Sequence, residues 1–203
     1  MLERKRPIST AVLVVNAVLM TGVTVWLLGP GLVLAKTKAR SQTPERICDH
    51  TLCRSPQTIR LIRDDGKVFE SSFDVESPIV HKGWVSIFPG ETLFVEADRD
   101  ENRLVNLRAV KRVRDPERTL ELKFWQDKGK PDMFLKVNNP FPKTMKYHAV
   151  MMLLDSDKLY KTSSCPVLAG KIALERWPHV VFQLLLFDFH FVDTDASKSA
   201  CEF

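Results

Sequence analysis

The chain has 203 residues, and its 30 Lys and Arg against 25 Asp and Glu give a formal net charge of +5. Hydrophobic residues make up 44% of the chain and charged residues 27%, a globular composition that excludes an intrinsically disordered protein. The same counts exclude collagen, coiled coils, polytopic membrane proteins and disulfide-dense miniproteins.

Residues 1–35 predict a targeting segment. A basic tip, Arg4-Lys5-Arg6, precedes residues 8–35, which contain no charged side chain. Gly29-Pro30-Gly31 then leads to small residues before Lys36, the order of a secretory signal peptide and its cleavage site. Residues 11–28 are also long enough to begin to span a bilayer, so an uncleaved membrane anchor is the alternative. Basic residues flank both ends, so a retained anchor leaves the orientation open.

Residues 36–56 are polar and basic and contain two prolines, which predicts a linker between the targeting segment and a domain at 57–203. From Gln57 the apolar period changes to two, and residues 58–63 and 67–70 flank the turn Asp64-Asp65-Gly66. This pattern predicts a hairpin with positive φ at both central turn residues.

The rest of the chain also predicts strands. Leu120, Leu122 and Phe124 should face a core, and Phe187, Phe189 and Phe191 should share one face of a later strand. Only residues 170–176 predict a short helix, which Pro178 would end. The further strands are expected at residues 91–98, 103–110, 119–125, 133–137, 145–154 and 180–192.

Seven to nine short strands in about 140 residues indicate an antiparallel β-sandwich. Residues 133–151, MFLKVNNPFPKTMKYHAVM, predict a strand, an Asn-Pro turn and a second strand. This stretch resembles the turn in many immunoglobulin-like or fibronectin-III-like sandwiches. The resemblance implies a fold and carries no function.

Four cysteines in an exported chain predict disulfides. One pairing joins Cys48 to Cys53 and Cys165 to Cys201, and the two crossed pairings would tie the linker to the sandwich. Free thiols are one alternative. Zinc held by Cys48, His50 and Cys53 is the other, but no second ligand pair follows, so no metal is expected.

Catalytic signatures are absent from the sequence: no nucleophile elbow, zinc-protease helix, P-loop or dinucleotide fingerprint occurs. The expectation is a non-enzymatic protein without a cofactor. The enzymatic alternative places a thiol nucleophile at Cys165 beside a histidine, or a metal at Cys48, His50 and Cys53. The acidic pairs lie in predicted turns, where they should cap backbone amides.

The candidate binding residues are five cations in one stretch and two tryptophans, Trp125 at the end of a predicted strand and Trp177 in a predicted loop beside Pro178. Export would exclude nucleic acid as the partner of these cations and favour an anionic lipid, a glycan or an acidic protein. An exposed tryptophan favours a binding surface. These candidates are Arg108, Lys111, Arg112, Arg114, Arg118, Trp125 and Trp177.

Together these patterns predict an exported interaction module of the cell envelope. It would be periplasmic, or anchored through residues 8–35 and facing the periplasm or exterior. A protein partner is expected first, through sheet edges or strand-end loops, and an anionic envelope component second. The rival interpretations are the thiol- or metal-dependent enzyme and an anchored adaptor that faces the cytosol.

Overall fold

Alternating apolar and polar side chains produce strands along most of the chain. A computed structural model describes residues 45–192 and Cys201, and this part is mainly β with one helical turn. The predicted strands are all present, but six further strands were not predicted as strands: β1, β4, β5, β6, β12 and β13, whose bounds follow. The elements are α1 (Glu45–Cys48), β1 (Cys53–Arg54), β2 (Gln57–Ile62), β3 (Val68–Phe73), β4 (Ser77–Pro78), β5 (Val80–His81), β6 (Trp84–Ile87), β7 (Thr92–Asp100), β8 (Arg103–Val110), β9 (Thr119–Gln126), β10 (Met133–Asn138), β11 (Thr144–Leu153), β12 (Leu159–Thr162), β13 (Ile172–Trp177) and β14 (Val181–Val192).

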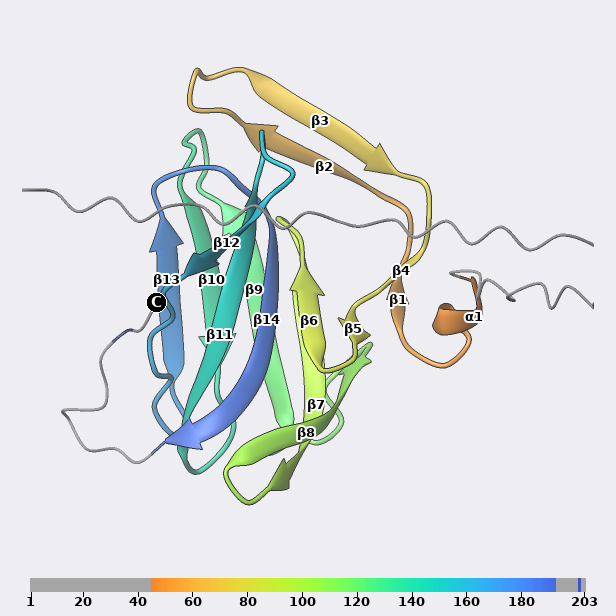
Figure 1. Cartoon of the computed structure of the whole chain (residues 1–203), viewed down its shortest axis with the longest axis vertical. Helices are drawn as coiled ribbons and strands as arrows, with labels where there is room; N and C mark the ends of the chain where they lie inside the picture. The colour runs from red at the N-terminus through yellow and green to blue at the C-terminus, as the bar shows by residue number, and fades with distance from the viewer. Residues whose placement is uncertain (1–44, 193–200, 202–203) are drawn as a thin grey trace, which may run out of the picture. The chain divides into compact units, whose positions relative to one another are not determined.

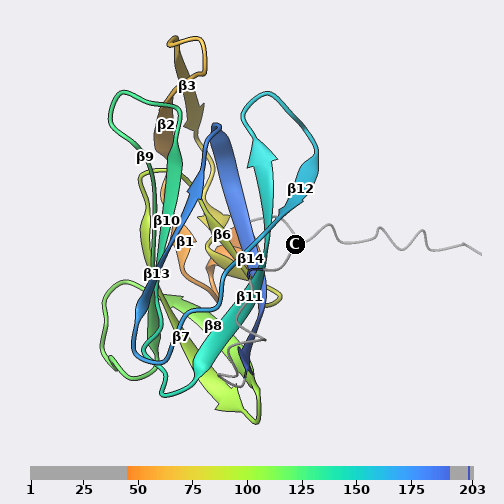
Figure 2. The ribbon, with the colours of Figure 1, turned by 90° about the vertical axis from the view of Figure 1, so that its left-hand side faces the viewer.

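Ten strands form one antiparallel sheet in the order β12-β11-β14-β8-β7-β9-β10-β13, and β5 and β6 extend it beside β14. In the described chain, β14 and β8 share a single residue pair, His190 with Arg103. At this junction the sheet divides into two layers, with β6, β14 and β11 in one and β7, β9, β10 and β13 in the other (Figures 1 and 2). The sheet does not close, because β12 and β13 remain its outer strands.

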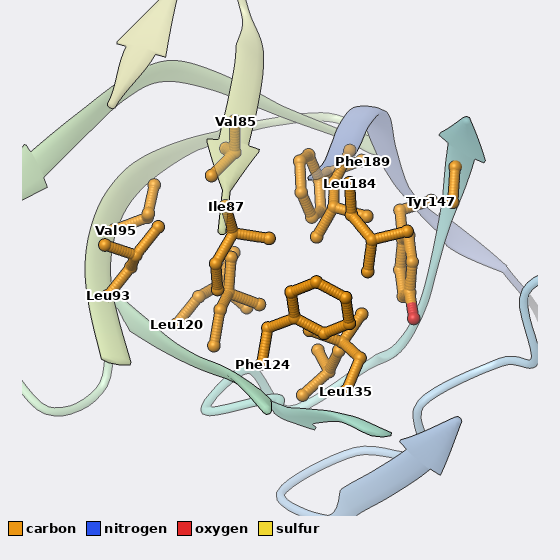
Figure 3. Close-up of a cluster of buried hydrophobic side chains, with 14 of the residues drawn as sticks. Val85, Ile87, Leu93, Val95, Leu120, Phe124, Leu135, Tyr147, Leu184 and Phe189 are labelled. Atoms are coloured by element: carbon orange, nitrogen blue, oxygen red, sulfur yellow. The ribbon is translucent and has the colours of Figure 1, made fainter. Parts of the chain in front are cut away.

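The core lies between the two layers. Leu120 and Phe124 of β9 are fully buried, which confirms their predicted inward face. They point toward Ile87, Leu184 and Phe189 from the opposite layer (Figure 3). Truncating such a side chain to alanine typically costs about 2–5 kcal/mol, so this contact holds the layers together.

The predicted helix at residues 170–176 is wrong. Most of this segment belongs to strand β13, which pairs with β10. Met133 lies opposite Trp177, and Asn138 lies opposite Ile172. The apolar side chains of Ile172 and Leu174 face solvent instead of the core, whereas Trp177 is buried. Six residues of ladder hydrogen bonding at the sheet edge outweigh the local helical pattern.

Phe187 does not share a face with Phe189 and Phe191, which corrects the prediction for β14. The register between β11 and β14 shifts here, and Asp188 has a left-handed φ of 52°. This β-bulge inserts one residue and reverses the alternation, so that Phe189 and Phe191 are buried while Phe187 points away from the core.

The hairpin of β2 and β3 is confirmed, but its turn differs from the prediction. Arg63 N donates to Lys67 O at 2.8 Å, which makes residues 64–66 a three-residue loop. Only Gly66 in this loop has a positive φ, 79°. Three-residue hairpin loops need one left-handed residue, at the end of the loop, rather than two.

Two interactions fix segments that the sequence treats as a linker and a turn. Arg54 in β1 is buried and contacts Ser86 in β6 and Glu91 just before β7, so the chain before Gln57 is already joined to the sheet. Asn139, in the predicted Asn-Pro turn, is fully buried and donates from Nδ2 to the carbonyl oxygens of Lys143 and Val167, at 2.9 Å each. Hydrogen bonds from the buried Asn139 side chain therefore hold the turn between β10 and β11 in place.

The predicted targeting segment, residues 1–35, and the first part of the predicted linker lie outside the described residues. Within residues 45–192, no helix has the length and apolar character needed to span a bilayer.

Candidate functional site

Four of the five predicted cations meet around one cavity, here called the basic pocket. Arg108 lies on β8, and Lys111, Arg112 and Arg114 follow in the loop between β8 and β9. The pocket has a volume of about 550 Å³. Its remaining lining consists of Leu52, Glu96, Ala109 and Val110.

The charges of the basic pocket are only partly balanced. Glu96, nearly buried on β7, accepts two hydrogen bonds from Arg108, at 2.9 and 2.6 Å. Across residues 45–192, no ion pair involves Lys111, Arg112 or Arg114, and all three are exposed. An anion that enters the pocket therefore meets three cations without an acidic partner.

The acidic residues of the loop do not neutralise these cations. The Asp115 carboxylate accepts a hydrogen bond from the Glu117 backbone N–H at 3.2 Å, and the Asp115 carbonyl accepts one from Thr119 Oγ1 at 2.5 Å. Both interactions close the turn before β9, the usual role of an aspartate in a loop.

Arg118 does not join the basic pocket. Its guanidinium forms an ion pair with Asp98 on β7 and lines a different cavity beside Pro140 and Phe141. The turn at Asp115 separates Arg118 from the other four cations, so the predicted basic face divides into two.

The two predicted tryptophans lie in different environments. Trp125 is half-buried on the outer face of β9, stacked on Phe134 with 5.6 Å between ring centroids. Trp177 is the last residue of β13 rather than part of a loop, which corrects the prediction. It is buried, and its indole N–H donates to Thr162 Oγ1 at 2.7 Å, so it belongs to the core.

The cysteines form the uncrossed pairing, Cys48–Cys53 and Cys165–Cys201. Cys165 therefore has no thiol to act as a nucleophile in this state. Cys48 and Cys53 are bonded to each other beside an exposed His50, and the described residues contain no group of side chains arranged to hold a metal ion.

Of the acidic residues predicted to cap backbone amides in turns, Asp65 does so, whereas Asp98 lies on β7 and pairs with Arg118, and Asp155 pairs with a side chain instead. Asp65 accepts a hydrogen bond from the Lys67 backbone N–H at 3.0 Å and pairs with the Lys67 ammonium at 2.8 Å. These contacts with Lys67 lower the pKa of the Asp65 carboxyl. Asp155 pairs with Arg63 across the hairpin loop at 2.5 Å.

Sequence reasoning assigned no role to a second cluster, on the outer face of β6 and β14. Trp84 is exposed and stacks on Phe187, with 4.0 Å between ring centroids and 17° between ring planes. Asp188 lies beside them, 3.5 Å from His148 and 3.7 Å from Arg103. The pairing of β6 with β14 brings Trp84 onto Phe187, and the bulge places Asp188 beside them. A period-two pattern shows neither a pairing between distant strands nor a bulge.

Comparisons of the chain with protein-family models, with curated proteins and with solved structures give no match.

Proposed function

We propose that this chain is an exported or membrane-tethered, non-enzymatic module of the cell envelope that binds an anionic envelope component through the basic pocket. Its two sheet layers would form an immunoglobulin-like or fibronectin-III-like sandwich that serves as a scaffold. The observation that carries the proposal is that three cations, Lys111, Arg112 and Arg114, line one cavity and form no ion pair with any acidic residue in the described part of the chain.

The chemistry of the pocket favours a phosphate-bearing head group. Guanidinium and ammonium groups donate charge-assisted hydrogen bonds to phosphate oxygens, and two arginines can do so with paired N–H groups. Leu52, Ala109 and Val110 add apolar surface beside the cations. A pocket that combines cations with apolar walls suits an amphipathic ligand better than a free inorganic ion.

The cysteine pairing supports a location outside the cytosol. Disulfides persist in oxidising compartments and are rare in cytosolic proteins.

Vesicle co-sedimentation tests the proposal. The protein is mixed with phosphatidylcholine vesicles that contain or lack phosphatidylglycerol, and binding is expected only to the anionic vesicles. The variant Lys111→Gln/Arg112→Gln/Arg114→Gln should lose about tenfold or more in binding, because each basic side chain near an anionic surface contributes about 1 kcal/mol.

The variant Lys158→Gln/Lys161→Gln/Lys171→Gln is the matched control, since it removes three exposed positive charges elsewhere. It should bind as the wild type does. Equal losses in both variants would show a general charge effect and would contradict a specific basic pocket, as would wild-type binding to neutral vesicles.

A protein partner is the second candidate, and the outer strand β13 favours it. Ile172 and Leu174 are each 60% exposed, and in the described chain β13 pairs with β10 alone. An unpaired strand edge with apolar side chains can add a strand from a partner. A photo-crosslinking residue at Leu174 should capture a partner in native membranes, whereas one at the exposed Val68 should not; equal capture at both sites would contradict this mode.

A further inference from the structure

The aromatic pair Trp84–Phe187 forms a flat, exposed shelf on the outer face of β6 and β14. Trp84 follows the tight turn between β5 and β6, and its indole is 39% exposed. Phe187 supports one face of the indole at a centroid distance of 4.0 Å. Exposed aromatic pairs of this kind are costly to leave in water, and they are common where a ligand covers them.

Two β-bulges build the surroundings of the shelf. Asp188 on β14 and Asn106 on β8 both have left-handed φ values, 52° and 51°, at register shifts of their strands. Bulges re-aim side chains next to binding sites. Here Phe187 faces outward in the regular alternation that follows the buried Leu186, and the bulge on β14 places the Asp188 carboxylate beside it.

A cavity of about 500 Å³ lies against the shelf and is lined by hydrogen-bonding groups of both kinds. Asp188 provides an acceptor, Arg103 and Lys82 provide donors, and the Asn106 side chain, whose Nδ2 donates to Asp98 at 3.0 Å, provides an amide oxygen as a further acceptor. Arg103 also lies 3.7 Å from Asp188, so positive and negative groups are interleaved rather than separated.

We propose that this cavity binds a saccharide, with one sugar ring stacked on Trp84. The C–H face of a pyranose is flat and apolar, whereas its rim of hydroxyls needs donors and acceptors together. A phosphate ligand would require donors without a carboxylate, and an amphipathic helix would require a longer apolar surface. The arrangement of shelf, carboxylate, guanidinium and amide meets the needs of a sugar ring.

A second tryptophan–phenylalanine pair, which is half-buried, shows why the assignment falls on Trp84. Trp125 also stacks on a phenylalanine, at a similar interplanar angle of 18°. The Lys123 ammonium, however, lies over the Trp125 ring at 5.5 Å. In the described chain no cation lies over Trp84 in this way, so its outer face is open to a ligand.

A titration with oligosaccharides, followed by the indole N–H resonances in NMR spectra, tests the site. The probes are cellotriose, tri-N-acetylchitotriose and a heparin-derived hexasaccharide. At least one probe should shift the Trp84 resonance while leaving those of Trp125 and Trp177 in place. Probes are added to about 10 mM, where even a millimolar complex would be mostly formed.

Variants separate the shelf from a general surface effect. Trp84→Ala should weaken binding of the active probe by about tenfold or more, and Trp125→Ala, the matched control, should not change it. Asp188→Asn keeps a residue that tolerates a left-handed φ and should weaken binding about fivefold through the lost charged acceptor. Urea unfolding of each variant shows whether the fold is retained.

Three results would overturn the assignment. The first is a Trp84 resonance that no saccharide moves. The second is a Trp84 resonance that moves only with a proline-rich peptide, which would make the cavity a peptide groove. The third is equal loss of binding in Trp84→Ala and Trp125→Ala. None of these results bears on the basic pocket, because the two cavities share no lining residue.

Discussion

Arg54 and Glu91 form a buried ion pair that joins β1 to the start of β7. Arg54 Nε lies 2.7 Å from Glu91 Oε1, and the two side chains are 8% and 10% exposed. Arg54 also donates to the Ser86 carbonyl at 2.6 Å, and Glu91 accepts from the Phe88 backbone N–H at 2.8 Å. The pair therefore anchors the segment just after the Cys48–Cys53 disulfide.

The first prediction concerns this pair. Arg54→Met should lower the free energy of unfolding by about 3–5 kcal/mol, because it leaves the Glu91 carboxylate buried without a cation. Arg54→Met/Glu91→Gln should recover part of this loss. Urea unfolding followed by tryptophan fluorescence measures both, and a loss below about 1 kcal/mol for the single variant would refute the anchoring role.

The second prediction concerns the turn between β10 and β11. Asn139→Leu should destabilise the protein by about 3 kcal/mol or more, because it leaves buried carbonyl groups without their donor. Asn138→Leu changes a neighbouring half-buried amide, for which the described residues show no side-chain hydrogen bond, and should cost much less. Similar unfolding midpoints for the two variants would contradict the proposed role of Asn139.

The third prediction compares the disulfides. The Cys165–Cys201 bond joins residues 36 apart and the Cys48–Cys53 bond residues 5 apart. In the chain-entropy model these loops correspond to about 4 and about 2 kcal/mol of stabilisation, respectively. Replacing each pair by serines should therefore lower the thermal midpoint more for Cys165/Cys201; the opposite order would contradict an entropic origin.

The fourth prediction concerns pH. Partial burial of Glu175 on β13 raises the pKa of its carboxyl, although a hydrogen bond from the Cys165 backbone N–H opposes the shift. The folded protein thus holds this proton more tightly than the unfolded chain does. The stabilisation that the protonated Glu175 carboxyl gives the folded state is complete below the ordinary pKa of 4.5. It is lost as the pH rises through the raised pKa.

Glu175→Gln should remove this dependence. As the pH rises from about 4 to about 7, the urea concentration at the unfolding midpoint of Glu175→Gln should increase relative to that of the wild type. Glu117→Gln removes an exposed carboxylate from a loop and serves as the control. A constant difference between Glu175→Gln and the wild type across this range would show that Glu175 does not couple folding to protonation.

The strands could be predicted where one face of the strand is buried and the other is exposed to solvent. In β9, Leu120, Leu122 and Phe124 alternate with charged neighbours, so the sequence itself carries the period. The same reasoning failed in β13, because Ile172 and Leu174 face outward and Glu175 faces the core side. Pairing with β10 decides that segment, and no local pattern reports such pairing.

The two candidate sites also differ in how far the sequence alone predicts them. The basic pocket could be predicted in large part, because Arg108, Lys111, Arg112 and Arg114 are near neighbours in the chain. Arg118 does not line the basic pocket, because it pairs with Asp98, which lies in a distant segment of the chain. The Trp84–Phe187 shelf depends on the pairing of β6 with β14, two strands distant in the chain, so it required the structure.

The redox state and mass of the native protein test the proposed location most directly, because the location decides which partners the chain can meet. The intact mass is measured after alkylation without reductant and again with reductant. We expect no alkylation before reduction and modification of all 4 cysteines after it, on a chain that starts at Lys36 or retains its anchor. A full-length chain that carries four alkyl groups before reduction would contradict the account, because it would place the domain in the cytosol.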